Sequence, residues 1–281
     1  MKIDAHQHVW QLSQPFCNWP TSVEAAIYRD FQPADLAPLL AEQGVTGTIL
    51  VQAAPALAET KYILGVADKA SFVCGVVGWV DMESDAAIED LKSLAAHPKF
   101  RGIRPMLQSI DDPLWVLEPR FDPVFRTLID LDLTFDALIL PHHVQVIREL
   151  ARRYPVLTII IDHAAKPPIR AGGAASSGFA SWSRDMARLA LEANVACKIS
   201  GLFTEARAGA GLSELRPWLN HLFEKFGSAR LMWGSDWPVL NLASDYASWH
   251  MLCENWLLDK APTDAKNIWG VTAARLYRII E

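Results

Sequence analysis

Hydrophobic and polar residues alternate in blocks along the chain. Short apolar runs rich in β-branched residues are separated by longer stretches in which apolar residues recur at helical spacing. Near-continuous apolar strands are typical of a parallel sheet that is covered on both faces. Eight runs are predicted to be strands: 3–10, 46–53, 72–80, 100–107, 133–138, 157–163, 195–202 and 230–237.

Each interval between these runs has room for a helix and two loops. Amphipathic helices are predicted over 33–43, 84–94, 121–130, 143–153, 182–193 and 246–258, and over 261–277 with an interruption at Gly270. Gly44 follows the first of them, as glycine often does just past a helix end. Eight strand–helix units predict a single-domain (β/α)8 barrel spanning residues 1–281. An open doubly wound sheet is the alternative, but no GxGxxG motif follows the first run.

One segment has the composition of a flexible loop. Residues 171–178 read AGGAASSG and follow the sixth predicted strand. Because the loops after barrel strands lie on the active face, we expect residues 169–181 to form a flexible loop or lid over the site. A surface loop without such a role is the simpler alternative.

Composition narrows the class of protein. Of the 281 residues, 51% are hydrophobic and 21% are charged, which indicates an ordered globular chain. The 26 basic and 32 acidic residues give a net charge of −6, so no basic surplus favours nucleic acid or anionic lipid. The four cysteines form no CxxC pair, and neither a signal peptide nor a membrane-length apolar run is found. We therefore expect a cytoplasmic protein with a small-molecule partner, and homo-oligomers remain open.

Polar residues stand at the carboxyl ends of three predicted strands. His6 and His8 end the first strand, and residues two apart on a strand point to the same side. His163 ends the sixth strand and Asp236 the eighth. In a barrel these ends open into one mouth, so we predict that the four side chains form the reaction centre.

Two mechanisms use these four residues. One divalent metal ion, zinc or manganese, bound by His6, His8, His163 and Asp236 would polarise a carbonyl and acidify water, with Asp236 accepting the proton. Without metal, the imidazoles would hydrogen-bond the carbonyl oxygen and Asp236 alone would activate water. The sequence leaves both open.

The fifth predicted strand lacks the further ligand that a two-metal site would need. No histidine ends this strand, and His142 and His143 come only after Pro141, where they resemble surface residues at a helix start. We therefore expect at most one ion.

Further polar and aromatic residues interrupt the apolar runs or follow them. The candidates for substrate contact are Gln52, Trp79, Arg104, Lys166, Lys198 and Trp237, with Trp10 and Trp19 also near the predicted mouth. Glutamine, arginine and aromatic faces suit a hydroxylated ring. For the buried cations the alternative is a structural ion pair with Asp136 or Asp162.

The longest motifs surround these residues. They read IDAHQHVW (3–10), LVQAAP (50–55), GVVGWVD (75–81), FRGIRPML (100–107), IDHAAKPP (161–168), CKISGL (197–202) and LMWGSDWP (231–238). Through them nearly the whole chain resembles the amidohydrolase superfamily, and most of all its metal-dependent-hydrolase branch of sugar lactonases such as the L-fuconolactonases. The resemblance implies a (β/α)8 barrel that opens a neutral aldonolactone, of the L-fucono, L-galactono or rhamnono type. It also implies that His6, His8, His163 and Asp236 occupy the active-site positions of the family.

Other activities on the same barrel stay open. The branch also contains lactonases for aromatic-catabolism lactones of the pyrone dicarboxylate or muconolactone type, some of them metal-free, but a dicarboxylate calls for several arginines and only Arg104 is clear. A zinc-dependent decarboxylase would share the four polar residues and would release carbon dioxide. A binding barrel with a dead site would tolerate their loss. A serine hydrolase is disfavoured because no GxSxG motif surrounds Ser235.

Overall fold

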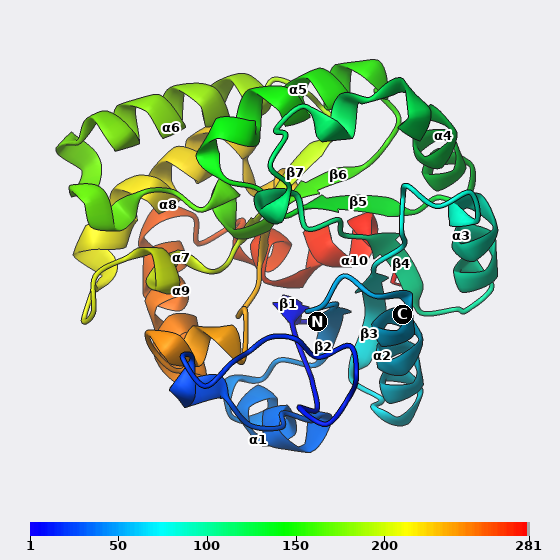
Figure 1. Cartoon of the computed structure of the whole chain (residues 1–281). Helices are drawn as coiled ribbons and strands as arrows, with labels where there is room; N and C mark the ends of the chain where they lie inside the picture. Colours follow the sequence, from blue (N-terminus) through cyan, green and yellow to red (C-terminus); the bar gives the residue numbers. More distant parts are fainter. Residues whose placement is uncertain (280–281) are drawn as a thin grey trace.

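Eight parallel strands form the centre of the molecule (Figure 1). The computed structural model describes residues 1–279. The strands pair in sequence order and are β1 (Ile3–Gln7), β2 (Gly47–Val51), β3 (Val73–Gly78), β4 (Phe100–Ile103), β5 (Thr134–Ala137), β6 (Ile159–Ile161), β7 (Val195–Ile199) and β8 (Leu231–Trp233). Backbone bonds from Asp236 N to His6 O and from His8 N to Trp237 O, each 2.8 Å, join β8 to β1. The predicted (β/α)8 barrel is confirmed, and the open sheet is excluded.

Helices surround the strands. They are α1 (Pro33–Gln43), α2 (Leu57–Lys69), α3 (Ala87–Ala95), α4 (Asp122–Asp130), α5 (Val144–Arg153), α6 (Ser177–Leu189), α7 (Leu202–Glu205), α8 (Leu212–Phe226), α9 (Tyr246–Lys260) and α10 (Thr272–Leu276). A π-helical turn, Asn267–Val271, precedes α10. Short 3-10 turns lie at Ala25–Ile27, Leu107–Ser109, Trp115–Leu117, Pro119–Phe121, Pro141–His143, Asp162–Ala165, Ile169–Ala171, Gly173–Ala175, Ser228–Arg230 and Val239–Leu242.

The bounds of several strands and helices differ from the prediction, because tertiary packing outweighs the local pattern of apolar residues. Each strand covers only part of the apolar run that predicted it, because buried loop residues beyond the strand are apolar as well. The predicted helix over 261–277 is interrupted at Gly270 as expected, because the π-helical turn contains this glycine and precedes α10, but its first residues form a turn and not a helix. A Cβ at Gly270 would lie 2.4 Å from the Met1 carbonyl oxygen, so this glycine lets the C-terminal segment approach the start of the chain.

The start and end of α1 follow directly from its sequence. The Asp35 carboxylate accepts a hydrogen bond from the Gln32 backbone N–H at 2.8 Å, and Pro33 occupies the first helical position, where its missing N–H costs nothing. Gly44 takes a left-handed conformation with φ of 64°, which ends the helix as predicted.

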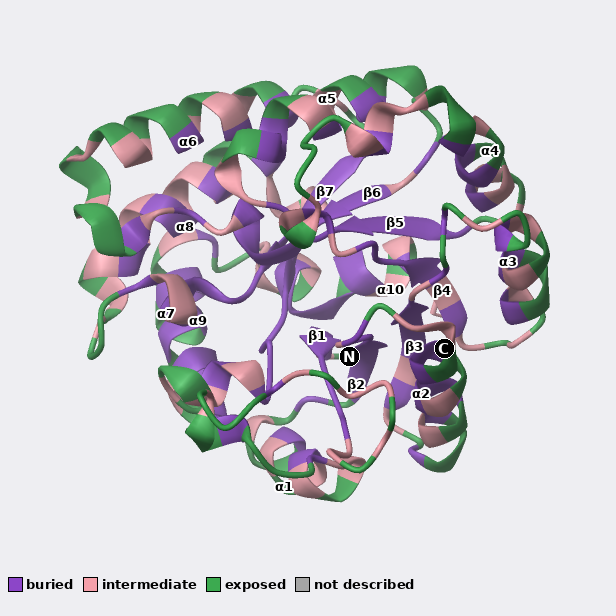
Figure 2. Cartoon of the chain, viewed as in Figure 1, coloured by how far each residue is buried: buried purple, intermediate pink, exposed green. Residues whose placement is uncertain are grey.

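Two apolar layers form the core. The larger lies between strands and helices, where strands are buried and helices expose their outer faces (Figure 2). The smaller lies inside the barrel and contains Ile3, Ile49, Val77, Ile160 and Met232 with Tyr277, which follows α10. The C-terminal segment thereby closes the end of the barrel where the strands begin, and the carboxyl ends of the strands remain for a site.

Residues 169–181 are partly ordered into secondary structure. They contain two 3-10 turns and the first residues of α6, and Arg170 donates hydrogen bonds to the Ala206 and Thr204 carbonyl oxygens, each at 3.2 Å. Ser176 caps α6 by accepting a hydrogen bond from Phe179 N. Movement of this segment over the site stays a prediction.

No helix in the described part of the chain combines the length and apolar character required to span a bilayer. All four cysteines are free, and Cys197 and Cys253 are buried while Cys17 and Cys74 are partly buried.

The contact between β4 and β5 yields a stability prediction. A Cβ at Gly102 would lie 2.1 Å from Thr134 Oγ1 and 2.5 Å from the Thr134 carbonyl oxygen, a backbone atom that cannot move aside. We expect Gly102→Ala to lower the free energy of unfolding by about 2–3 kcal/mol or more, measured by chemical denaturation. The control, Gly65→Ala on the exposed side of α2, meets no atom within 4 Å and should raise stability by up to about 1 kcal/mol. Equal stability of the two variants would contradict this packing.

Candidate active site

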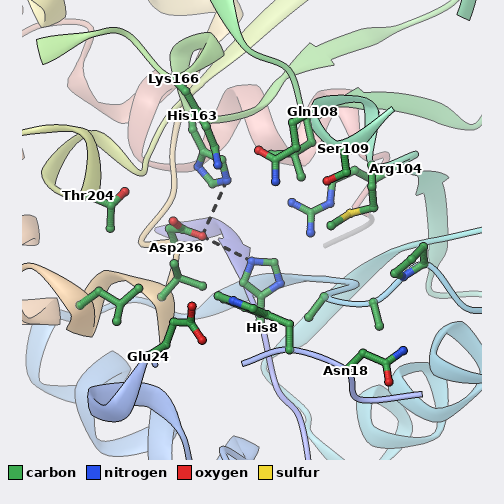
Figure 3. A pocket seen from close by; sticks show the side chains of 18 of the residues that line it. His8, Asn18, Glu24, Arg104, Gln108, Ser109, His163, Lys166, Thr204 and Asp236 are labelled. Atoms are coloured by element: carbon green, nitrogen blue, oxygen red, sulfur yellow. Dashed lines mark ion pairs between the residues drawn. The ribbon is translucent and has the colours of Figure 1, made fainter. Parts of the chain in front are cut away.

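A pocket of about 490 Å³ opens at the carboxyl ends of the strands (Figure 3). Its apolar lining includes Trp19, Pro55, Met106, Leu138, Val239 and Leu242. Its polar lining consists of His8, Asn18, Glu24, Arg104, Gln108, Ser109, His163, Lys166, Thr204, Glu205 and Asp236. A cavity of this size, lined by both apolar and polar side chains, suits a small cyclic molecule with polar substituents.

Three imidazoles converge on one carboxylate at the bottom of this pocket. Asp236 Oδ1 lies 3.4 Å from His8 Nε2, 3.7 Å from His163 Nε2 and 3.8 Å from His6 Nε2. Figure 3 shows the Asp236 carboxylate between His8 and His163. His6 does not line the pocket, but its Nε2 is 3.1 Å from His8 Nε2. The structure thus brings together the four residues that the strand ends placed at one mouth.

Unusual backbone conformations aim two of these side chains. After β6 the residues from His163 to Lys166 have left-handed φ angles of 49–59°, and Asp236 after β8 has φ of 60°. Non-glycine residues in this region carry strain, which persists where the surrounding structure fixes it and often marks functional sites. Gly201 provides the space, because a Cβ there would lie 2.7 Å from His163 Nδ1.

Each imidazole is held from behind by its Nδ1 atom. His8 Nδ1 lies 2.8 Å from the Val51 carbonyl oxygen, which can only accept, so Nδ1 carries the proton and Nε2 presents a lone pair to the site. His163 Nδ1 lies 2.9 Å from Ser200 Oγ. His6 Nδ1 lies 3.1 Å from Lys198 Nζ and 3.3 Å from Asp162 Oδ1, and its Nε2 lies 3.3 Å from Arg104 Nη1.

A fully buried ion network supports His6. Lys198 Nζ lies 2.7 Å from Asp136 Oδ2 and 2.9 Å from Asp162 Oδ1, and Arg104 Nη1 lies 3.2 Å from Asp162 Oδ2. The Tyr277 hydroxyl donates to Asp136 at 2.5 Å. Two cations balance two carboxylates, which is the arrangement that a buried charge requires.

The six candidates for substrate contact divide into two groups. Arg104 and Lys166 line the pocket, and the other four do not. Lys198 is occupied by the ion network, as the structural alternative expected, and Gln52 donates its amide to the Arg104 carbonyl oxygen at 2.8 Å. Trp237 packs edge-on against Phe31, with ring centroids 5.2 Å apart. Trp79 is partly buried, and Thr60 Oγ1 hydrogen-bonds its backbone.

Two sequence expectations near the mouth need correction. His143 is buried and not on the surface, and its Nδ1 accepts a hydrogen bond from Leu140 N at 3.2 Å. His142 is exposed as expected. Of the tryptophans placed near the mouth, Trp19 lines the pocket, whereas Trp10 is buried and donates its indole N–H to the Arg29 carbonyl oxygen.

Sequence reasoning missed most of the polar lining. Asn18, Glu24, Gln108, Ser109, Thr204 and Glu205 all stand in loops or short helical turns. The signal used to find candidates was a polar residue at the end of an apolar run, and these residues carry no such signal.

The electrostatics of the centre favour a charged Asp236 carboxylate beside neutral imidazoles of His6 and His163. Burial lowers the pKa of His6 well below its usual value and that of His163 to about 4. Burial raises the pKa of Asp236, but the imidazoles outweigh it and leave this pKa below that of an ordinary aspartate. At neutral pH, Asp236 can therefore accept a proton.

The donor set fits a divalent metal ion. His6, His163 and Asp236 each offer one ligand atom, all within 4.8 Å of one another. His8 Nε2 carries a lone pair and lies 3.1 Å from His6 Nε2, so one ion could be bound by both nitrogens. Two ligands of a tetrahedral zinc ion, each about 2.1 Å from it, lie about 3.4 Å apart, close to the separations here. A metal ion bound to His6 Nε2 would replace the hydrogen bond between this nitrogen and Arg104 Nη1.

A buried glutamate holds one wall of the pocket. Glu59 is 2% exposed, and its carboxylate accepts hydrogen bonds from Ala53 N at 2.9 Å and Ala54 N at 2.7 Å. Burial raises the pKa of Glu59 to about 7, and the two backbone N–H groups oppose this rise. Because Ala53 and Ala54 line the pocket, Glu59 positions its wall without reaching the cavity.

Comparison with known proteins identifies relatives over the full length of the chain. The amidohydrolase family model matches residues 3–279. An L-fucono-1,5-lactonase of Burkholderia ambifaria is 46% identical over 99% of this chain and 96% of its own. An L-fucono-1,5-lactonase of Burkholderia multivorans is 32% identical over 100% and 97%. A crystal structure of an amidohydrolase from B. multivorans with bound zinc covers both chains completely at 30% identity, with a TM-score of 0.92.

The donor set generates a metal-binding prediction. The protein is first stripped of metal with a chelator, and the chelator is then removed. In calorimetry it should bind about one equivalent of Zn²⁺ or Mn²⁺. His163→Ala should weaken this binding at least tenfold, because the variant lacks one of the metal ligands. His142→Ala, which changes an exposed histidine, should bind as the wild type does. Equal affinity of the two variants would contradict a site at these residues.

The support of the wall by Glu59 generates a second prediction. Glu59→Gln keeps one acceptor oxygen but turns an amide N–H toward the other backbone N–H, so unfolding free energy should fall by about 1–3 kcal/mol. The KM for substrate should rise as well, because the wall loosens. Exposed Glu42→Gln is the control and should change neither quantity. An unchanged KM in the Glu59 variant would show that the wall does not depend on this carboxylate.

Proposed function

The chain belongs to the amidohydrolase family, and from this premise we propose that it is a lactonase that hydrolyses the ester of a neutral sugar lactone. The observation that carries the proposal is the ionised Asp236 carboxylate, within 3.8 Å of three imidazoles, in a pocket of about 490 Å³. The relatives named L-fucono-1,5-lactonase support the substrate class. The substrate we favour is an aldonolactone of the L-fucono, L-galactono or rhamnono type.

In this mechanism Asp236 activates the attacking water. The carboxylate accepts a proton from water while the water oxygen bonds to the acyl carbon, and the carbonyl electrons move onto oxygen. The Arg104 guanidinium lines the same pocket, and it stabilises the negative charge of this oxyanion while it stays paired with Asp162. When the tetrahedral centre collapses, the ring C–O bond breaks and Asp236 returns the proton to the leaving oxygen. The hydroxy acid formed then ionises and releases one proton.

We propose that one divalent ion, zinc or manganese, is held by His6, His163 and Asp236, with His8 as a further donor. When bound there, the ion supplies a Lewis acid for the carbonyl and lowers the pKa of water. In the metal-free alternative the imidazoles donate hydrogen bonds to the carbonyl oxygen. The geometry of His8 disfavours this alternative, because its Nδ1 proton is used by Val51 and its Nε2 can only accept.

We also propose that the reaction takes place in the cytoplasm. Four free cysteines suit a reducing compartment, in which disulfides rarely form.

A pH-indicator assay over a panel of lactones tests the proposal. Neutral aldonolactones should release one proton per turnover, and Asp236→Asn should lower kcat at least about 100-fold because the proton acceptor is lost. Exposed Asp85→Asn serves as the control and should keep the wild-type rate. Each rate is measured with and without chelator, and full activity of metal-free protein would select the metal-free mechanism. Inactivity on every lactone, or carbon dioxide release from a phenolic acid instead, would overturn the assignment.

A further inference from the structure

A carboxylate without a partner lines the pocket. Glu205 is the last residue of α7, which follows β7, and it is partly buried. Its side chain makes no hydrogen bond or ion pair with any other residue in the range 1–279. The second glutamate of the lining, Glu24, differs because its carboxylate already accepts from Thr21 N and Thr21 Oγ1, each at 2.8 Å. Glu205 is therefore the lining glutamate with both carboxylate oxygens open to a ligand, whereas Oε2 of Glu24 is already engaged.

The charges around Glu205 leave little attraction for an anion. Arg104 and Lys166 are the cations of the lining, and Arg104 is committed to Asp162 at 3.2 Å. Lys166 has no ion pair within the described chain. Burial raises the pKa of Glu205, and the positive charges of Lys166 and, outside the lining, Arg170 oppose that rise, so Glu205 interacts with both cations. With Glu205 ionised, the charge of Lys166 is offset within the pocket.

Building on the proposed function, we propose that Glu205 determines which lactones enter productively. Its carboxylate accepts hydrogen bonds from hydroxyl groups of a neutral polyhydroxylated lactone and offsets the Lys166 charge that a lactone bearing a carboxylate would use. Hydrogen bonds to a charged acceptor are stronger than those between neutral groups, so this one residue both selects hydroxyls and rejects anions.

The same charge acts on the product. Hydrolysis converts a neutral lactone into a hydroxy acid that is an anion at pH 7. Glu205, Glu24 and Asp236 then repel the new carboxylate, which favours its release from the pocket. Gln108 and Ser109, which lie across the pocket from Glu24, remain available to orient the substrate (Figure 3).

The test compares two lactones of the same ring, a neutral aldonolactone and an aldarolactone that carries one additional carboxylate. For the wild type, kcat/KM should strongly favour the neutral lactone. Glu205→Gln should lower the ratio of kcat/KM for the neutral lactone to kcat/KM for the acidic lactone at least about tenfold. The variant loses a charged acceptor for the hydroxyl groups of the neutral lactone, and Lys166 becomes free to pair with the carboxylate of the acidic one. Adding Lys166→Met to this variant should remove the gain on the acidic lactone.

Two further variants separate charge from contact. Glu205→Asp keeps the charge but withdraws it by one methylene, so it should lose activity on the neutral lactone and still reject the acid. Glu42→Gln, an exposed charge change outside the pocket, should leave the ratio unchanged. Rejection of the acid by the wild type should also weaken at high ionic strength, because salt screens exposed charges.

The outcomes distinguish this inference from the proposed function. If the wild type hydrolyses neutral lactones and Glu205→Gln keeps the wild-type ratio, or loses both substrates equally, Glu205 does not set selectivity although the lactonase assignment stands. If the wild type hydrolyses no lactone of the panel, the proposed function itself is overturned.

Discussion

The candidate site depends on the Asp162 carboxylate, which is fully buried inside the barrel. It pairs with Lys198 and Arg104 and lies beside His6 Nδ1, so one side chain connects the ion network to the imidazoles. Burial raises the pKa of Asp162, but the charges of Lys198 and Arg104 and the hydrogen bond with His6 outweigh burial and hold this pKa well below its usual value. Removing one member of such a network leaves an uncompensated charge, which costs about 3–5 kcal/mol. The barrel interior can therefore hold His6 in one orientation.

Barrel geometry turns this buried network into an open site. The C-terminal segment fills the end where the strands begin, and Tyr277 reaches Asp136 from that side. At the other end, left-handed turns at His163 and Asp236 direct their side chains toward the mouth. The polar partners of these two side chains, Ser200 and His8, follow neighbouring strands. The surrounding barrel therefore holds the strained turns in place.

The sequence predicts those parts of the molecule that regular strands position. Eight apolar runs and the polar residues at their ends suffice for the barrel and for the convergence of His6, His8, His163 and Asp236. Lys198 shows the limit of that reasoning, because a polar residue inside an apolar strand reads the same whether it faces substrate or another buried charge. Glu205 and Gln108 could not be predicted, since the path of a loop depends on tertiary contacts and not on a repeating pattern.

The relation between network, carboxylate and pocket leads to one chemical claim, that a water activated by Asp236 attacks the acyl carbon of a lactone. Hydrolysis in ¹⁸O-labelled water under single-turnover conditions, followed by mass spectrometry of the product, tests it most directly. The account predicts one labelled oxygen in the carboxylate and none in the hydroxyl group released from the ring. Label in that hydroxyl, which would mean cleavage of the alkyl–oxygen bond, or a product without label, would contradict it.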